Sequence, residues 1–117
     1  MTVAQPPAAA IRSLVRRVIE HAPTDVRAPL LAQAETLEYV DGPVTMMRLR
    51  VAGEAAPASS AVSPVPGGPH VFDDHEDAIG GLILWLDGDG YIDCLEYWWV
   101  TDDMPPELPS PSQVRRS

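Results

Sequence analysis

Two segments of the sequence concentrate side chains that can bind a metal ion or transfer a proton. The first is the Asp87-Gly88-Asp89-Gly90 run, which is followed by Asp93 and Glu96. The second, residues 70–77 (HVFDDHED), places two histidines among four carboxylates. Carboxylates suit calcium, and imidazole together with carboxylates suits zinc, manganese or iron. The sequence therefore offers two candidate metal sites, whose possible ligands are Asp87, Asp89, Asp93 and Glu96 in one and His70 and His75 in the other.

The first of these segments, residues 85–96, resembles the calcium loop of EF-hand and dockerin-like proteins. Asp87, Asp89 and Asp93 match the third, fifth and ninth loop positions, and Glu96 matches the bidentate carboxylate. The resemblance implies a calcium site. The first ligand position is occupied by Trp85, however, and an indole cannot coordinate calcium.

The same stretch also favours a β-hairpin over residues 80–100. The runs 82–86 and 91–100 are rich in β-branched and aromatic residues, which suit strands. Asp and Gly tolerate positive φ, so residues 87–90 can form a tight turn at little steric cost. Apolar residues occupy both alternate sets of positions, so we expect the strands to be covered on both faces, or on one face by the chain and on the other by a partner. We favour this hairpin, and metal binding remains an alternative.

The histidine and carboxylate segment is interpreted in a similar way. Consecutive residues of a strand or loop point in different directions, whereas a metal ion needs converging ligands. We therefore favour a solvated acidic loop that leads into the strand beginning near Gly80. Neither Cys94 nor any serine has a recognisable local pairing with a histidine, so no catalytic residue and no cofactor is assigned.

The elements that must position these residues follow from periodicity and composition. Residues 8–22 carry apolar side chains at helical spacing, which predicts an amphipathic helix. Asp41-Gly42 predicts a hairpin over 36–51. The composition of residues 52–69, rich in Pro, Ala and Gly, predicts a mobile insert. The prolines of residues 105–117 predict an extended or disordered tail. The predicted fold is a single α+β domain over 1–117, in which a small antiparallel sheet of about four strands, from two hairpins, packs on the N-terminal amphipathic helix.

Charge is distributed unevenly along the chain. The formal net charge is -9, all eight basic residues are arginines, and residues 51–114 contain none of them. Such a field repels nucleic acid and anionic membranes and favours a basic protein partner. No apolar run is long enough to span a bilayer, arginines interrupt any signal-like segment, and one cysteine excludes an internal disulfide. We expect a cytoplasmic protein, and the richness in alanine, proline and arginine indicates a bacterial source.

The C-terminal third resembles small uncharacterised bacterial proteins that end in an apolar strand, an Asp/Gly turn, a Leu-Glu-Tyr strand and a proline-rich tail. The resemblance implies a compact α+β domain and carries no function. The leading functional hypothesis is a non-enzymatic, acidic protein-binding module that engages a basic partner surface, for example as an immunity protein that masks a toxin. Its expected partner-binding residues are Trp98, Trp99, Asp102 and Asp103. The alternatives are a calcium- or transition-metal-binding protein and a homodimeric scaffold.

Overall fold

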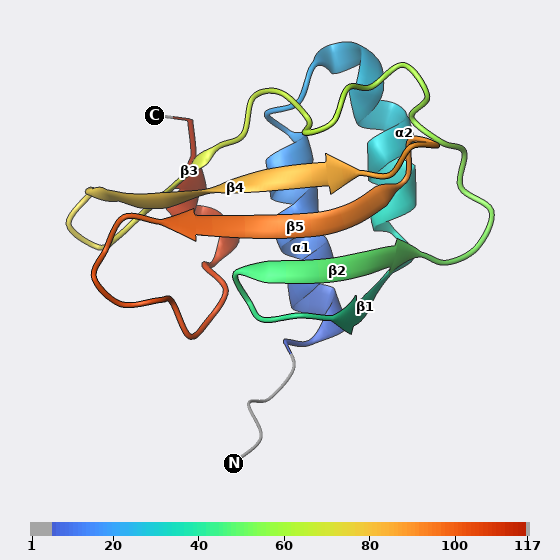
Figure 1. The fold of residues 1–117 in the computed structure, drawn as a ribbon. Coiled ribbons are helices and arrows are strands. Elements are labelled where there is room, and N and C mark those ends of the chain that lie inside the picture. The colour runs from blue at the N-terminus through green and yellow to red at the C-terminus, as the bar shows by residue number, and fades with distance from the viewer. Residues whose placement is uncertain (1–5, 117) are drawn as a thin grey trace.

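Two helices lie on one face of a single antiparallel sheet in the computed structural model, which describes residues 6–116 (Figure 1). Across the sheet the strand order is β1-β2-β5-β4-β3-β6. Each neighbouring pair is antiparallel. The predicted α+β class is therefore confirmed. The elements are α1 (Ala8–Ile19), α2 (Thr24–Ala34), β1 (Leu37–Asp41), β2 (Met46–Val51), β3 (His70–Phe72), β4 (Ala78–Leu86), β5 (Ile92–Trp99), the 3-10 turn η1 (Pro111–Gln113) and β6 (Val114–Arg115).

The prediction of about four strands is wrong, because the sheet has six. The two additional strands, β3 and β6, are three and two residues long. They come from segments that their composition assigned to an acidic loop and to a tail. Each contributes one fully buried valine, Val71 and Val114, and these two residues are register partners. Short strands of this kind carry too few alternating residues for periodicity to reveal them.

The core fills the space between the helices and one face of the sheet. The amphipathic α1 buries the residues that recur at helical spacing, and alternate residues of the strands face it. Neither helix is long and apolar enough to cross a membrane, nor is any other helix in the described range. The largest fully buried side chains include Ile11, Leu14, Ile19, Leu30, Met47, Leu82, Leu84 and Leu95.

One polar side chain, Gln33 of α2, is fully buried in this core. Its Nε2 donates to the carbonyl oxygens of Ala56 and Gly90 at 3.1 and 3.0 Å, and its Oε1 accepts from the backbone N–H of Ile92 at 2.8 Å. Buried polar groups need such partners, since an unpaired one costs free energy on folding. Gln33 therefore ties α2 to the start of β5 and fixes the position of the turn between β4 and β5.

The segment 52–69 contains no helix or strand, but it is packed against the rest of the protein. Ala58 and Val65 are buried. The N–H of Ala58 donates to the carbonyl oxygen of Gly90, and that of Val65 donates to the carbonyl oxygen of Leu84, both at 2.9 Å. These bonds place the segment beside β4 and the turn that follows it. The predicted mobility of the segment stays a prediction.

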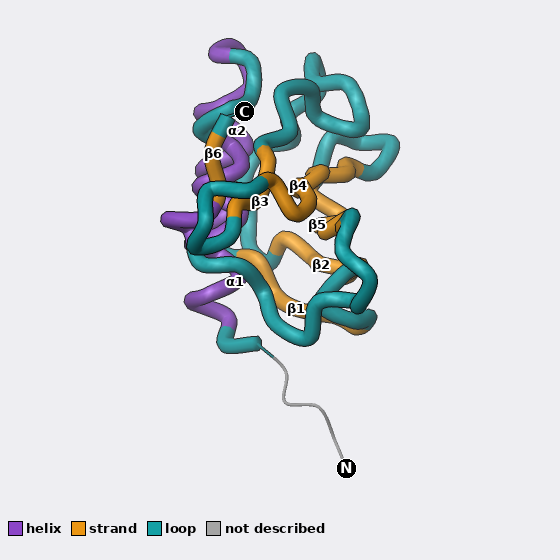
Figure 2. The backbone as a smooth tube through the Cα atoms, turned by 90° about the vertical axis from the view of Figure 1, so that its left-hand side faces the viewer, coloured by secondary structure: helices purple, strands orange, loops and turns teal. Residues whose placement is uncertain are grey.

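The two faces of the sheet have different surroundings. When the molecule is turned by 90°, the helices lie on one side of the strands only (Figure 2). We call the opposite side of the sheet the open face. Within residues 6–116 no helix packs on it, so its side chains meet each other, the surrounding loops and solvent.

Candidate functional site

The predicted calcium loop is a hairpin turn. The N–H of Asp87 donates to the carbonyl oxygen of Tyr91 at 2.8 Å, and Gly90 has a φ of 91°. Oδ1 of Asp87 accepts the N–H groups of Asp89 and Tyr91 at 2.9 and 3.0 Å. The carboxylate therefore reverses the backbone, as Asp commonly does in turns. Glu96 lies farther along β5, where its Oε1 accepts the indole N–H of Trp85, the residue in the first loop position.

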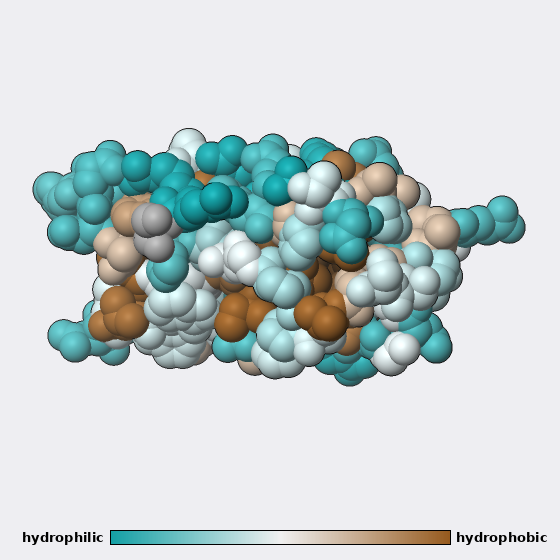
Figure 3. Space-filling view, turned by 90° about the horizontal axis from the view of Figure 1, so that it is seen from above, coloured by the Kyte–Doolittle hydropathy of each residue, from teal (hydrophilic) through white to brown (hydrophobic). Residues whose placement is uncertain are grey.

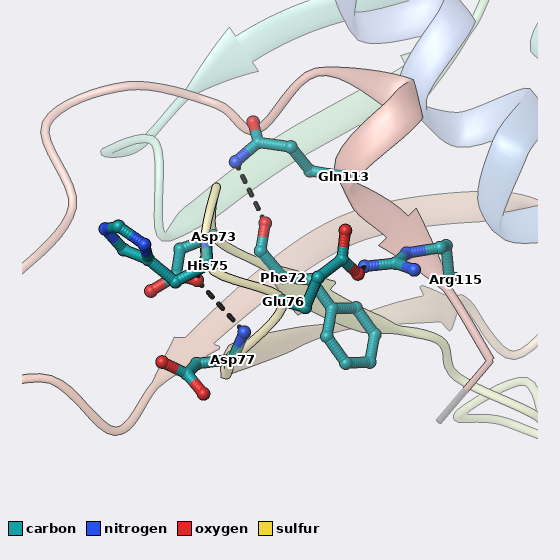
Figure 4. Close-up of polar contacts among 7 residues, drawn as sticks. All are labelled: Phe72, Asp73, His75, Glu76, Asp77, Gln113 and Arg115. Carbon is teal, nitrogen blue, oxygen red and sulfur yellow. Dashed lines mark hydrogen bonds and ion pairs between the residues drawn. The ribbon is translucent and has the colours of Figure 1, made fainter.

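The histidine and carboxylate segment also fails to converge on one point (Figure 4). Oδ1 of Asp73 accepts the N–H groups of His75 and Asp77 at 2.8 and 3.0 Å. These hydrogen bonds lower the pKa of Asp73, and the bond from the N–H of Asp77 has the largest effect. Glu76 pairs with Arg115. Figure 4 shows His75 and Asp77 pointing away from that ion pair.

His70, the other predicted ligand in this segment, lies in β3 and makes an aromatic contact. Its ring meets the ring of Trp98 edge-on, with centroids 5.6 Å apart and an interplanar angle of 87°. His70 and His75 thus belong to different surroundings. Over residues 6–116 the structure contains no group of three or more His, Cys, Asp or Glu side chains arranged to hold a metal ion.

The open face brings together aromatic, sulfur-containing and charged side chains from five strands. Register partners of an antiparallel sheet point to the same side, and Met46, Glu96 and Ile83 form one such row across β2, β5 and β4. Figure 3 shows the molecule from above, with the open face edge-on along the lower side, where apolar residues are interspersed with hydrophilic ones. The open face comprises Met46, Arg48, His70, Phe72, Ile83, Trp85, Cys94, Glu96, Trp98 and Arg115.

Trp98 lies over β4 because its register partner, Gly81, has no side chain. A Cβ at position 81 would be 2.4 Å from Cζ2 and 2.7 Å from Nε1 of Trp98, closer than real contacts allow. The indole therefore crosses β4 and reaches His70 on β3. Glycine in a strand interior often marks such a close approach.

Cys94 sits between Arg48 and Trp85 in the next row of the open face. Its Sγ is 3.3 Å from Sδ of Met46. Burial, followed by the negative charges of Asp93 and Glu96, raises the pKa of the thiol. A raised pKa keeps the sulfur protonated near neutral pH, whereas a cysteine nucleophile needs the thiolate. Cys94 is thus a packing residue of the open face.

The arginines of the open face are each matched by a carboxylate. Arg48 pairs with Asp41 at 3.2 Å, and Arg50, on the same side of β2, pairs with Glu38 at 2.7 Å. Arg115 pairs with Glu76, and its guanidinium carbon Cζ lies over the Phe72 ring, 4.3 Å from the ring centroid. Pairing removes most of the positive charge of this face. Further acids lie at both ends of the β4–β5 ribbon. The end where β4 begins and β5 ends carries Asp73, Asp74, Asp77, Asp102 and Asp103. The end with the turn between the two strands carries Asp87, Asp89 and Asp93.

Of the residues expected to bind a partner, Trp98 lies on the open face itself. Trp99 is 37% exposed at the end of β5, and Asp102 and Asp103 are exposed in the loop that follows. These four residues therefore lie near the same end of the ribbon. Trp85 was missed as a site residue, although the apolar residues on both sides of each strand had indicated a second face that the chain need not cover.

No family model matches this chain, and neither a curated protein nor a solved structure matches it. The resemblance of its C-terminal third to small bacterial proteins stays a prediction. Evidence on function therefore comes from the geometry of the open face.

Proposed function

We propose that this protein is a binding module whose open face docks a protein partner with a basic surface. The observation that carries the proposal is the placement of Trp85 and Trp98, both half-buried, on the sheet face that the helices do not cover. Tryptophan is enriched among the residues that dominate binding energy at protein interfaces. The solvated face of an antiparallel sheet is usually polar, so two indoles there are unusual for a sheet that serves only folding.

The arrangement of charge supports a basic partner. The centre of the open face is mainly apolar and aromatic, with Glu96 as its one carboxylate, and acids that form no ion pair within residues 6–116 lie at the two ends of the β4–β5 ribbon, which resembles the apolar core and polar rim of protein interfaces. Because the arginines of the face already have acidic partners, the excess charge presented to a partner is negative. Complementary charge accelerates docking and disfavours acidic proteins. An immunity protein that masks a basic toxin is one specific form of this proposal.

Selection of peptides against the full chain tests the proposal. Random displayed peptides should enrich sequences that combine Lys or Arg with an aromatic or aliphatic residue. Their affinity should fall at least about tenfold when NaCl rises from about 50 to about 500 mM, since salt screens exposed charges. Enrichment of neutral or acidic peptides, or affinity that does not respond to salt, would contradict a basic partner.

Two variants locate the binding surface. Trp98→Ala should weaken the selected peptides at least about tenfold, the effect of one interface anchor. Val62→Ala is the matched control, because Val62 is also an exposed apolar residue but belongs to the segment 52–69. Equal losses in the two variants would place binding elsewhere.

A second copy of the chain is the competing occupant of the open face. Sedimentation at micromolar concentration distinguishes the two, since a dimer that buries this face would be observed as a doubled mass. A monomer removes the homodimer and leaves the face free for a different protein.

A further inference from the structure

Glu96 occupies the middle of the open face. It lies on β5, is half-buried, and has Met46 of β2 and Ile83 of β4 as its register partners. The indole Nε1–H of Trp85 donates to its Oε1 at 3.0 Å. This bond fixes Oε1 against the sheet, and Oε2 is not among the buried side-chain atoms of residues 6–116 that lack a hydrogen-bond partner.

The negative charge of Glu96 has no cationic partner in the described part of the chain. The four ion pairs of residues 6–116 use other carboxylates. Arg48, which faces Cys94 in the adjacent row, is paired with Asp41. A cation supplied by a partner could therefore pair with Glu96 without displacing an existing ion pair.

Two indoles lie near Glu96 on the open face. Along the open face of β4, Ile83 lies between Gly81 and Trp85, and the indole of Trp98 covers Gly81. Along this face, the apolar side chain of Ile83 therefore lies between the positions of the two indoles, with the carboxylate of Glu96 beside it. We call these four residues, Ile83, Trp85, Glu96 and Trp98, the Glu96 socket.

We propose that the Glu96 socket binds one lysine or arginine side chain of the partner. This inference rests on the proposed function and specifies how the partner is recognised. The aliphatic stem of such a side chain packs on Ile83, because long basic residues bury their methylenes on apolar surface while the charge reaches a polar group. The cationic head pairs with Glu96 and lies close to indole rings, which attract cations. A neutral side chain of the same length would gain only the apolar contact.

Titration of the full, 15N-labelled chain with Nα-acetyl-lysine methylamide tests the socket directly. The indole N–H signals of Trp85 and Trp98 should shift and saturate with millimolar affinity, the order expected for one ion pair with an aromatic contact. The same compound acetylated on Nε keeps the stem and lacks the charge, so it should leave these signals nearly unchanged. If both compounds shift the signals equally, or neither does, the socket is refuted.

Glu96→Gln isolates the charge, because an amide oxygen can still accept the Trp85 indole N–H. We expect this variant to bind the lysine probe at least about tenfold more weakly, the loss typical of a charge-assisted contact. Glu107→Gln removes an exposed carboxylate from the loop after β5 and should leave the affinity unchanged. Equal binding by Glu96→Gln and the unmodified protein would overturn the proposal.

The outcomes separate the socket from the general function. Basic peptides that need Trp98 but are indifferent to Glu96→Gln would leave the open face as the docking surface and refute the socket. A lysine probe that needs Glu96, without any peptide that binds the open face, would support the socket and contradict the proposed protein partner.

Discussion

The two faces of the sheet are formed by the same strands. Successive residues of each strand point to opposite faces, so the two faces carry different side chains. On β4, Leu82, Leu84 and Leu86 point toward the helices, whereas Ile83 and Trp85 point to the open face. The helix-facing residues of β4 are aliphatic and buried, while the open face combines indoles, a cysteine thiol and ion pairs. Because side chains alternate along a strand, one sequence can bury one face to stabilise the fold and leave the other face available for the proposed partner. The following substitutions test that division of roles.

The largest expected difference lies between two neighbouring residues of β4. Leu84→Ala should lower the free energy of unfolding by about 2–5 kcal/mol, because Leu84 is 1% exposed and its loss leaves a cavity. Ile83→Ala, on the open face, should cost less than half as much, since its side chain is already partly in water. Urea denaturation followed by tryptophan fluorescence measures both. Equal losses would show that both faces stabilise the fold to the same extent.

Gln33 is the polar exception on the helix-facing side. Gln33→Leu should lower the free energy of unfolding by about 1–3 kcal/mol, because the buried N–H of Ile92 loses its acceptor. Gln113→Leu is a matched control. Gln113 also bonds backbone, at Phe72 O, but it lies at the half-exposed edge, where water can replace the lost bonds. If Gln113→Leu is destabilised as much as Gln33→Leu, burial of the hydrogen bond does not explain the effect at Gln33.

The sequence predicted the elements that have a clear period or a turn signal. The apolar spacing of 8–22 and the Asp/Gly turns at 41–42 and 87–90 predict features that correspond to α1 and two hairpins. Strands β3 and β6 were missed because they are only three and two residues long and pair with each other across a large sequence separation, in addition to the local pairing of β3 with β4. Long-range pairing of this kind leaves no local pattern.

Only part of the candidate site could be predicted, because some of its contacts also depend on the pairing between strands. The tryptophans of β5 were predicted to bind a partner on the basis of residue type, since Trp is typical of interfaces, and that role stays a prediction. The contact between Trp85 and Glu96 joins two strands and depends on the register of β4 with β5. Placement of Trp98 over Gly81 likewise needs that register, which a single sequence does not define to one residue.

Gly81→Ala tests whether the order of the open face depends on that register. The new methyl group would meet the Trp98 ring, so the indole must move away from His70. We expect a loss of about 1 kcal/mol, the lower end of the range for overpacking, together with a change in near-ultraviolet circular dichroism. Gly88→Ala is the control, because a Cβ there has open space around it. An unchanged tryptophan signal in Gly81→Ala would show that Trp98 does not rest on this glycine.

The smallest effect is expected from the ion pairs at the edge of the open face. Arg50 and Glu38 join β2 to β1 by an ion pair of 2.7 Å, but their side chains are 68% and 46% exposed. Arg50→Gln should therefore lower the free energy of unfolding by less than about 1 kcal/mol, and by less still in high salt. The double variant Arg50→Gln with Glu38→Gln completes a thermodynamic cycle that isolates the pair. A coupling energy comparable to the cost of Leu84→Ala would contradict the division between the faces, because the open face would then stabilise the fold as strongly as the helix-facing core.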